Sequence, residues 1–335
     1  MSIAEETPSE VSPAAARSAP VRITPVEALA AVLVVTMLLR GRLDALLAGP
    51  RLQTWTTVFV SVLLQAVPFL VFGVALSAAI ATLVPRSFWD RALPRNPVLS
   101  VPVAGVAGVV LPGCECGSVP IAGSLIRRGV TPAAALAFLL AAPAVNPVVL
   151  TATAIAFPHR PAIVVARAVA GLVVAVLMGW SWLLIGRADW IRLPHRPDLE
   201  DASRARAFWT ACRHDVLHAG GFLVVGAAAA ASINVLVPER WLQGLTGHPA
   251  AAVLALAVLA VLLSICSEAD AFVAGSLSQF SLTARLVFLT VGPMVDLKLI
   301  SMQTAAFGRR FTVRFATATF GLAICVGTLI GTVLL

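Results

Sequence analysis

The chain has 335 residues, of which 59% are hydrophobic and only 12% are charged, with a net charge of +8 and a mean hydropathy of +0.94. A soluble domain is about a quarter charged, so these charges are too few to cover a water-facing surface, and the composition predicts an integral membrane protein. The excess of base would suggest a nucleic-acid partner in a soluble protein, but arginine collects in the cytoplasmic loops of membrane proteins, and we expect no nucleic acid here. The odd number of cysteines, five, argues against a disulfide framework.

Apolar segments long enough to cross about 30 Å of hydrocarbon recur along the chain. The first 24 residues, with Pro, Ser and Glu, are predicted to be a disordered tail (1–24), and 25–55 is predicted to hold an extra helix and a loop. Clear spans follow at 57–84, 131–157, 161–186, 215–237, 283–306 and 313–335. Two further apolar segments, 97–127 and 249–279, are interrupted by Gly, Pro, Cys and acidic residues. With about 8–10 hydrophobic helical segments, the sequence predicts an all-α polytopic membrane protein.

Short motifs of the first half recur in the same order in the second half. The sequence FLVFG at 69–73 returns as FLVVG at 222–226, and AGSL at 122–125 returns unchanged at 274–277. An ordered series of matches indicates an internal duplication. The resulting parts are a first transmembrane repeat at 56–186, a polar inter-repeat loop at 187–214 and a second transmembrane repeat at 215–335.

The distribution of arginines favours an inverted arrangement of the two repeats. If 97–127 is a re-entrant hairpin, each half crosses the membrane three times, and more than twice as many arginines lie on the cytoplasmic side as outside, where Arg167 is counted. Single crossings at 97–127 and 249–279 would divide the arginines almost equally. The positive-inside rule therefore favours the hairpin. We expect inverted repeats with broken helices at mid-membrane, an architecture that many transporters share.

The most informative stretch is PGCECGSVP at 112–120. Gly and Pro end the preceding apolar helix, and irregular backbone at membrane depth is tolerated only inside protein or beside a water-filled cavity. Cys114 and Cys116 could bind a soft substrate such as Cu(I) or an arsenic(III) centre; the alternative is that they are small packing residues. The candidate site residues of this stretch are Cys114, Glu115, Cys116, Gly117 and Pro120.

The sequence CSEAD at 266–270 takes the place of this motif in the second half. Cys266 corresponds to Cys114, and Glu268 corresponds to Cys116. An ionisable group at membrane depth costs about 2.5–3.5 kcal/mol on insertion scales, so we predict that Glu268 and Asp270 bind a substrate or a proton. A pair of acids that faces water at the interface is the alternative.

Prolines interrupt a spanning segment in each half. The candidate residues there are Pro143, Asn146 and Pro147 in the first half and Pro293, Asp296 and Lys298 in the second. Positions i and i+2 of a helix point apart, so Asp296 and Lys298 can pair only if the helix unwinds after Pro293. Otherwise Lys298 needs Glu268, Asp270 or another partner. A lysine inside a span is a candidate functional residue, with snorkelling to the interface as the alternative.

On these residues the sequence resembles a family of predicted permeases that includes the ArsP organoarsenical efflux permeases. The matching motifs are CECGSVP at 114–120, AGSL at 122–125, NP at 146–147 and GPMVDLK at 292–298. The resemblance implies a multi-pass permease of the plasma membrane that acts as an exporter, in a family linked to trivalent organoarsenicals and to copper or zinc. The motif at 266–270 lacks a second Cys-x-Cys, which rules out a symmetric cage of four thiols.

Together these motifs predict a secondary transporter that moves a soft metal, metalloid or related solute by alternating access. Cys114 and Cys116 would contact the substrate, the carboxylates would bind it or a counter-ion, and Lys298 would neutralise a carboxylate in the empty site. No ATPase or enzyme motif occurs in a fitting context, and no cofactor is expected. Two alternatives stay open: a membrane thiol oxidoreductase using Cys114 and Cys116, whose small-ring disulfide would be strained, and a membrane scaffold that transports nothing.

Overall fold

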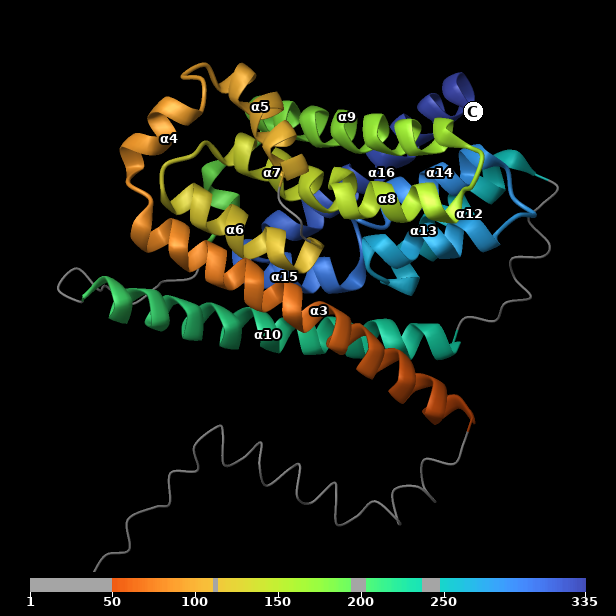
Figure 1. Cartoon of the computed structure of the whole chain (residues 1–335), viewed down its shortest axis with the longest axis horizontal. Coiled ribbons are helices and arrows are strands. Elements are labelled where there is room, and N and C mark those ends of the chain that lie inside the picture. Colours follow the sequence, from red (N-terminus) through yellow and green to blue (C-terminus); the bar gives the residue numbers. More distant parts are fainter. Residues whose placement is uncertain (1–49, 111–113, 194–202, 237–247) are drawn as a thin grey trace, which may run out of the picture. The chain divides into compact units, whose positions relative to one another are not determined.

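The computed structural model describes residues 50–110, 114–193, 203–236 and 248–335, and every regular element in these ranges is a helix (Figure 1). The expected tail at 1–24 and most of the extra helix and loop expected at 25–55 lie outside the described residues. The helices described below belong to one unit, Gln53–Leu335.

The same order of long and short helices occurs in both halves. The first half contains α3 (Pro50–Leu83), α4 (Arg86–Ala92), α5 (Pro97–Val110), α6 (Glu115–Arg127), α7 (Pro132–Val145), α8 (Pro147–Ala156) and α9 (Pro161–Ile185), followed by the short 3-10 helix η1 (Ala188–Trp190). The second half contains α10 (Arg204–Leu236), α12 (Pro249–Leu263), α13 (Ser267–Ser276), α14 (Leu282–Val291), α15 (Leu297–Phe307) and α16 (Arg309–Leu334). This order accords with the duplication inferred from the motifs.

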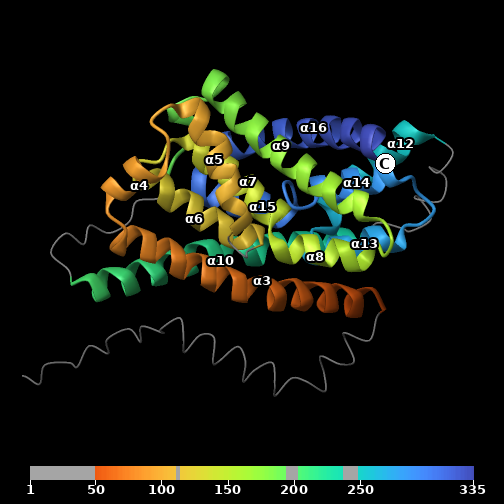
Figure 2. The same cartoon turned by 45° about the horizontal axis from the view of Figure 1, so that its top comes forward.

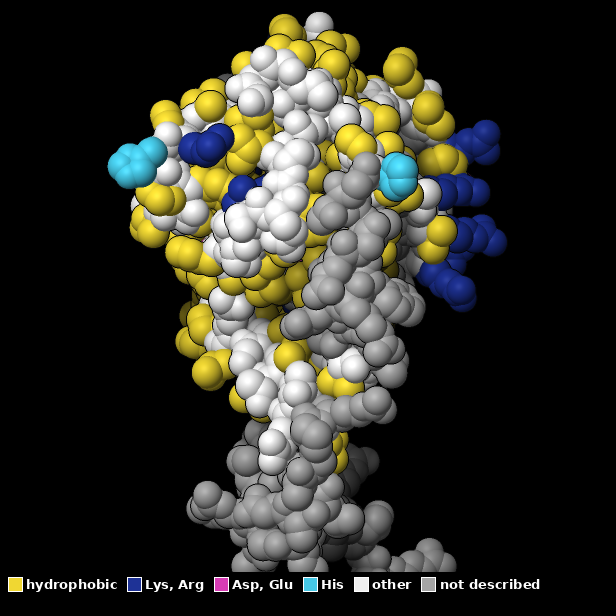
Figure 3. All heavy atoms as spheres, turned by 90° about the vertical axis from the view of Figure 1, so that its right-hand side faces the viewer, with side chains coloured by type: hydrophobic (Ala, Val, Ile, Leu, Met, Phe, Trp, Pro, Cys, Tyr) yellow, Lys and Arg dark blue, Asp and Glu magenta, His cyan; other side chains and the backbone are white. Residues whose placement is uncertain are grey.

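Among the described residues, five helical segments are long and apolar enough to cross a membrane, which confirms the multi-pass prediction. They are Leu52–Leu83, Pro132–Ala156, Pro161–Ile185, Ala205–Ile233 and Arg309–Leu334. The helices α5, α12 and α14 are apolar but shorter. Figure 3 shows a side of the molecule on which the coloured surface is mainly hydrophobic, and most of the Lys and Arg side chains in view gather along one edge.

One helix begins earlier than the hydropathy suggests. The sequence assigns 187–214 to a polar loop, but α10 begins at Arg204. Its first residues alternate Arg with Ala and aromatic residues, and Arg and Ala are both strong helix formers. Charge marks where a span ends, but it does not stop a helix, so hydropathy alone places this helix start too late.

Two short helices begin after interruptions that the sequence places correctly. Before α6, Cys114 is extended, with φ −82° and ψ 175°. Before α13, Ser264 takes the left-handed conformation, with φ 49°, and Cys266 is extended, with φ −79° and ψ 155°. The equivalent cysteines of the two motifs are therefore the N-cap residues of equivalent helices.

The proline motifs interrupt the other pair of helices. Asn146 separates α7 from α8, and its side chain accepts a hydrogen bond from the backbone N–H of Val149 at 3.0 Å. Asp296 precedes α15 and accepts a bond from the N–H of Leu299 in the same way. A side-chain oxygen at the N-cap satisfies a helix N–H that would otherwise lack a partner. The capping side chain thus makes each break tolerable inside the protein.

The long helices form two antiparallel pairs (Figures 1 and 2). The helices α3 and α10 lie on one side of the short helices, and α9 and α16 lie on the other. Trp55 near the start of α3 donates to Ser232 near the end of α10 at 3.0 Å, and Ser77 near the end of α3 donates to Asp215 near the start of α10 at 3.4 Å. On the other side, the end of α9 meets the start of α16, where the rings of Trp182 and Phe311 are 5.5 Å apart.

Two glycines let the long helices approach the short ones closely. Any Cβ on Gly73 of α3 would collide with the backbone of Gly117 in α6. Gly226 of α10, which matches Gly73 in the repeated motif, lies against α15, and a Cβ there would be 2.8 Å from the Cα of Lys298. Close packing of small residues is a main source of helix association in membranes. The repeated glycine therefore serves packing in both halves.

The contact between α3 and α6 predicts a stability difference between two Gly→Ala variants. Gly73→Ala should destabilise the protein by about 1–3 kcal/mol, because the methyl group forces the two backbones apart. Gly221→Ala on α10 is the matched control, since open space surrounds a Cβ there, and it should leave stability unchanged or raise it by up to about 1 kcal/mol. Thermal unfolding in detergent measures both. Equal midpoints would contradict the close approach.

Candidate functional site

Four short helices, two from each half, begin inside the protein. Their N-cap residues are all buried: Cys114, Asn146, Cys266 and Asp296. The helices α6 and α15 begin at the same ion pair, Glu115–Lys298. They are also close near their ends, where a Cβ on Gly123 would be 4.0 Å from the Phe307 ring. In Figures 1 and 2, α6 leads toward α4, whereas α8 and α13 lead toward α12. Helix N-termini carry partial positive charge, so their gathering here favours acidic groups.

A buried ion cluster lies where α6 meets α15. The Lys298 ammonium donates to a Glu115 carboxylate oxygen at 2.9 Å and lies 3.3 Å from a carboxylate oxygen of Asp296. All three residues are at most 2% exposed. Glu115 also occupies the first turn of α6 and Asp296 the N-cap of α15, so both acids lie at positive helix ends. The cluster joins the two halves of the chain.

The unwound chain before α15 explains how Asp296 reaches Lys298. The helix α14 ends at Val291, and Asp296 is extended, with φ −140° and ψ 171°. The chain is therefore unwound after Pro293, which is the condition under which Asp296 and Lys298, two positions apart, can pair. The other partner is Glu115, whereas the sequence named Glu268 and Asp270 as candidates. Lys298 is buried and lies at the start of α15, so it does not snorkel to a water-facing surface.

Second-half backbone and hydroxyl groups complete the cluster. Ser267 donates to the other Glu115 oxygen at 3.2 Å. The Lys298 ammonium also donates to the carbonyl of Ile265 at 3.2 Å, and its backbone N–H donates to Ser264 at 3.3 Å. The irregular segment between α12 and α13 therefore supplies the polar groups that hold Lys298 and Glu115 in place, which is how broken backbone is tolerated in a membrane protein.

Arg167 is a site residue that the sequence reasoning misplaced. The positive-inside count treats it as an outer-side charge, but the side chain is 1% exposed and points into the protein from α9. It donates to the Thr153 hydroxyl of α8 at 2.6 Å and to the Ser267 carbonyl at 2.9 Å. Its position, one and a half turns inside an apolar helix, is the signal that could have identified it.

Two acids of the second motif, Glu268 and Asp270, lie near Arg167 but have carboxylate oxygens without a hydrogen-bond partner. Asp270 is 1% exposed, and neither of its carboxylate oxygens has a hydrogen-bond partner. Glu268 is half-buried, with one buried oxygen also lacking a partner. Both are within electrostatic reach of Arg167, whose Nε also lacks a partner. Asp270 therefore does not face water as an interfacial residue would.

The three cysteines of the two motifs surround the cluster. Cys114, Cys116 and Cys266 are buried, each at most 5% exposed. Cys114 and Cys116 lie side by side, and Cys116 is within electrostatic reach of Lys298. Among the described side chains, no three His, Cys, Asp or Glu residues gather in a way that could hold a metal ion. Any soft ligand here would meet two neighbouring thiols, not a closed cage.

The remaining predicted residues shape the helices. Gly117 and Pro120 are buried within α6, and Pro120 accepts a hydrogen bond from the Ser77 hydroxyl at 2.9 Å through its carbonyl. Pro143 and Pro293 are buried near the two breaks. Pro147 begins α8 and is exposed, so it shapes the helix start and does not line the cluster.

Comparison with known proteins assigns this arrangement to a family. A family model described as "Predicted permease", ArsP_1, matches residues 51–332. The chain belongs to this family. It is 35% identical over 262 residues to the "UPF0718 protein YcgR" of Bacillus subtilis (strain 168), covering 76% of this chain and 89% of that protein. It is 33% identical over 281 residues to a "Putative two-component membrane permease complex subunit" of Streptococcus mutans serotype c, covering 82% of this chain and 93% of that protein. No solved structure matches significantly.

Family membership and the apolar helices together make the chain a multi-pass membrane permease. The family match spans both halves, so it includes all four short helices and the ion cluster between them. It also supports a transporter of small solutes over an enzyme, in agreement with the prediction from the motifs.

The ion cluster predicts a non-additive response to substitution. Lys298→Met should destabilise the protein by about 3–5 kcal/mol, because it leaves Glu115 and Asp296 as buried charges without their cation. Adding Glu115→Gln to Lys298→Met should recover part of this loss, since one stranded charge is removed. Thermal unfolding of the two single variants and the double variant in detergent measures the coupling. Strictly additive losses would show that Lys298 and Glu115 do not interact.

Proposed function

We propose that this permease moves a small soft solute out of the cell across the plasma membrane by alternating access to the site at the four helix starts. The observation that carries the proposal is the buried cluster of Glu115, Lys298 and Asp296, which stands where both halves of the chain break their helices. Charges and irregular backbone at membrane depth are costly and mark transport pathways in membrane proteins.

The proposal includes an inverted relation of the two halves. Equivalent long helices run antiparallel: α3 against α10 through the Trp55–Ser232 and Ser77–Asp215 bonds, and α9 against α16 through Trp182 and Phe311. Equivalent short helices, α6 and α13, lead away from the centre in opposite directions (Figures 1 and 2). In this reading α5–α6 and α12–α13 are re-entrant hairpins. Such inverted halves can exchange their conformations, which opens a central site to each side in turn.

A small cavity between α6, α10 and α15 supports a path toward the site from one side. Its volume is about 40 Å³, and its polar lining residues are Arg127, Asp215 and His218. His218 lies 3.2 Å from the carbonyl of Ala305. The cavity is large enough for a water molecule, and widening it would need only a shift of α10 against α6 and α15.

The thiols give the proposal its substrate class. Cys114 and Cys116 are adjacent soft ligands beside a lysine, and soft thiolates select soft ions such as Cu(I). A trivalent arsenical binds two thiols with the same preference. The burial of both thiols favours this role over an electron-exchanging pair, because reactive redox cysteines are partly exposed.

Uptake into everted membrane vesicles tests the function. An exporter should accumulate at least one member of a panel of trivalent arsenicals, Cu(I), Zn(II) and small anions. Cys114→Ser should lower the initial rate of that member by about tenfold or more, equal to ~1.4 kcal/mol, since it removes one of the two soft ligands. Cys325→Ser, at an exposed position on α16, is the control and should transport normally. If no panel member moves, or if Cys114→Ser transports at the wild-type rate, the soft-solute proposal fails.

Asp270 is the residue that we propose exchanges the coupling proton. An ionised carboxylate without any donor is strongly disfavoured at this depth, so the arrangement in which Arg167 binds Thr153 and Ser267 fits a protonated Asp270. On release of the proton, Arg167 can turn toward the carboxylate. Besides Arg167, the charged groups within electrostatic reach of Asp270 are Glu115, Lys298 and Asp296, and its carboxyl group lies against Gly292 at the start of the α14–α15 break. Proton exchange would thus act on the break that holds Asp296 and Lys298.

Asp270→Asn separates coupling from transport. In proteoliposomes loaded with a pH-sensitive dye, the variant should lose accumulation driven by a pH gradient, because the amide cannot release a proton. It should retain exchange of the transported panel member at equal pH. Asp189→Asn, at an exposed carboxylate, should behave as wild type. Gradient-driven accumulation by Asp270→Asn at the wild-type rate would exclude Asp270 as the proton carrier.

A further inference from the structure

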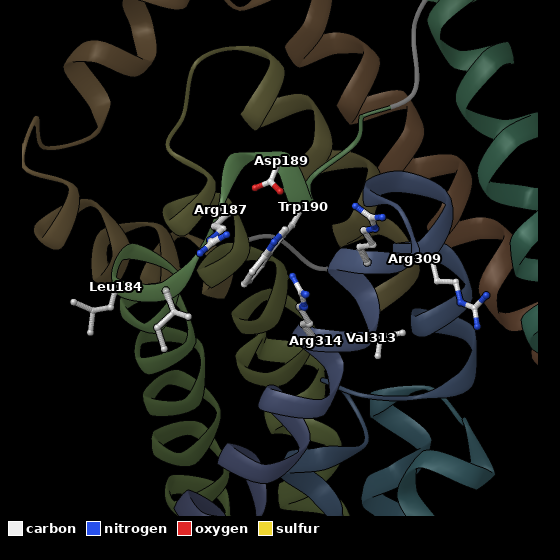
Figure 4. A pocket seen from close by; sticks show the side chains of 10 residues that line it. Leu184, Arg187, Asp189, Trp190, Arg309, Val313 and Arg314 are labelled. Atoms are coloured by element: carbon white, nitrogen blue, oxygen red, sulfur yellow. The ribbon is translucent and has the colours of Figure 1, made fainter.

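A large open pocket that shares no residue with the ion cluster lies where α9 ends and α16 begins (Figure 4). Its volume is about 970 Å³. Among the described residues, four arginines line it, Arg187, Arg309, Arg310 and Arg314, together with one acid, Asp189. The transport proposal uses none of these residues, so the surplus of positive charge has no explanation in that mechanism.

The position of the arginines on α16 is unfavourable without an anion. Arg309 and Arg310 are the first two residues of this 26-residue helix, and Arg314 follows one turn later. The N-terminus of a helix carries partial positive charge and favours acids, so three arginines there repel both the helix end and one another. All of them are exposed. A bound anion would relieve this repulsion and use the same helix end as a binding group.

An aromatic ring fixes part of the pocket. The Arg314 guanidinium lies 4.2 Å from the centre of the Trp190 ring. Figure 4 shows Arg187 and Arg314 on the two sides of Trp190, with Arg309 at the outer edge. Trp190 in turn packs edge-on against Trp182 of α9, with ring centres 6.0 Å apart. Tryptophan is enriched where membrane helices leave the hydrocarbon, so this pocket lies at a membrane boundary.

The pocket also has an apolar side. Leu184, Ile185 and Val313 line it and are 85%, 70% and 58% exposed. Leu184 and Ile185 end the candidate span Pro161–Ile185, and Val313 lies in the first turns of the candidate span Arg309–Leu334. A soluble phosphate would use the arginines and leave these side chains uncovered. A molecule with an anionic head and hydrocarbon tails would cover both parts.

We propose that this pocket binds an anionic phospholipid, with its phosphate on the arginines and its acyl chains along Leu184, Ile185 and Val313. Basic pockets between transmembrane helices bind acidic headgroups in this manner. The binding site ties the end of α9 to the start of α16, which come from different halves of the chain. The inference goes beyond the transport function and does not depend on the identity of the transported solute.

Native mass spectrometry of the full-length protein in mild detergent tests the site. Phosphatidylglycerol should remain bound at concentrations at which phosphatidylcholine does not. The double variant Arg309→Gln/Arg310→Gln should weaken phosphatidylglycerol binding by roughly tenfold or more, since each arginine near a membrane surface contributes to anion attraction. The matched control is Arg91→Gln/Arg95→Gln, which removes the same charge at exposed positions around α4 and should bind as wild type. Asp189→Asn removes the competing acid and should tighten binding.

Three results would overturn the inference. Equal weakening by both double variants would show attraction to net charge only. Equal binding of phosphatidylglycerol and phosphatidylcholine would show that the arginines do not select an acidic head. Displacement of the lipid by an equal concentration of inorganic phosphate would show an anion site that does not use the apolar side.

Discussion

The ammonium of Lys298 lies between the carboxylates of Glu115 and Asp296, where α6 and α15 begin. A lysine is costly at membrane depth, and a buried ion pair is stable only when further hydrogen bonds satisfy its remaining groups. Here Ser267 and the carbonyl of Ile265 supply them. The cluster therefore depends on the interruption between α12 and α13, because Ile265 and Ser267 lie at that interruption.

The interruptions and the tight packing around them follow from that dependence. Extended residues precede α6, α13 and α15, and the side chains of Asn146 and Asp296 cap the helices that follow them. Gly73 and Gly226 allow α3 and α10 to lie directly against α6 and α15.

Local signals in the sequence predict most of the fold. Hydropathy predicts the spans, and Gly, Pro, Cys and acids at membrane depth predict the interruptions near Cys114 and Cys266. Unwinding after Pro293 is a condition for an Asp296–Lys298 pair, with another partner for Lys298 as the alternative. The partners could not be predicted in this way. Lys298 pairs with Glu115, 183 residues earlier, and such a contact depends on how the two halves pack. A count of arginines treats Arg167 as a boundary charge, although its place inside an apolar helix is a sequence signal; its partners on α8 and α13 depend on how the helices pack.

Access to the cluster from both sides of the membrane is the central claim, and thiol labelling measures it most directly. In a protein whose only cysteine is Cys116, a small membrane-impermeant thiol reagent can be applied to right-side-out and to everted vesicles. The account predicts slow labelling from both sides, because Cys116 is buried in this conformation and becomes accessible as the halves alternate. Labelling from one side alone, under every condition, would contradict alternating access.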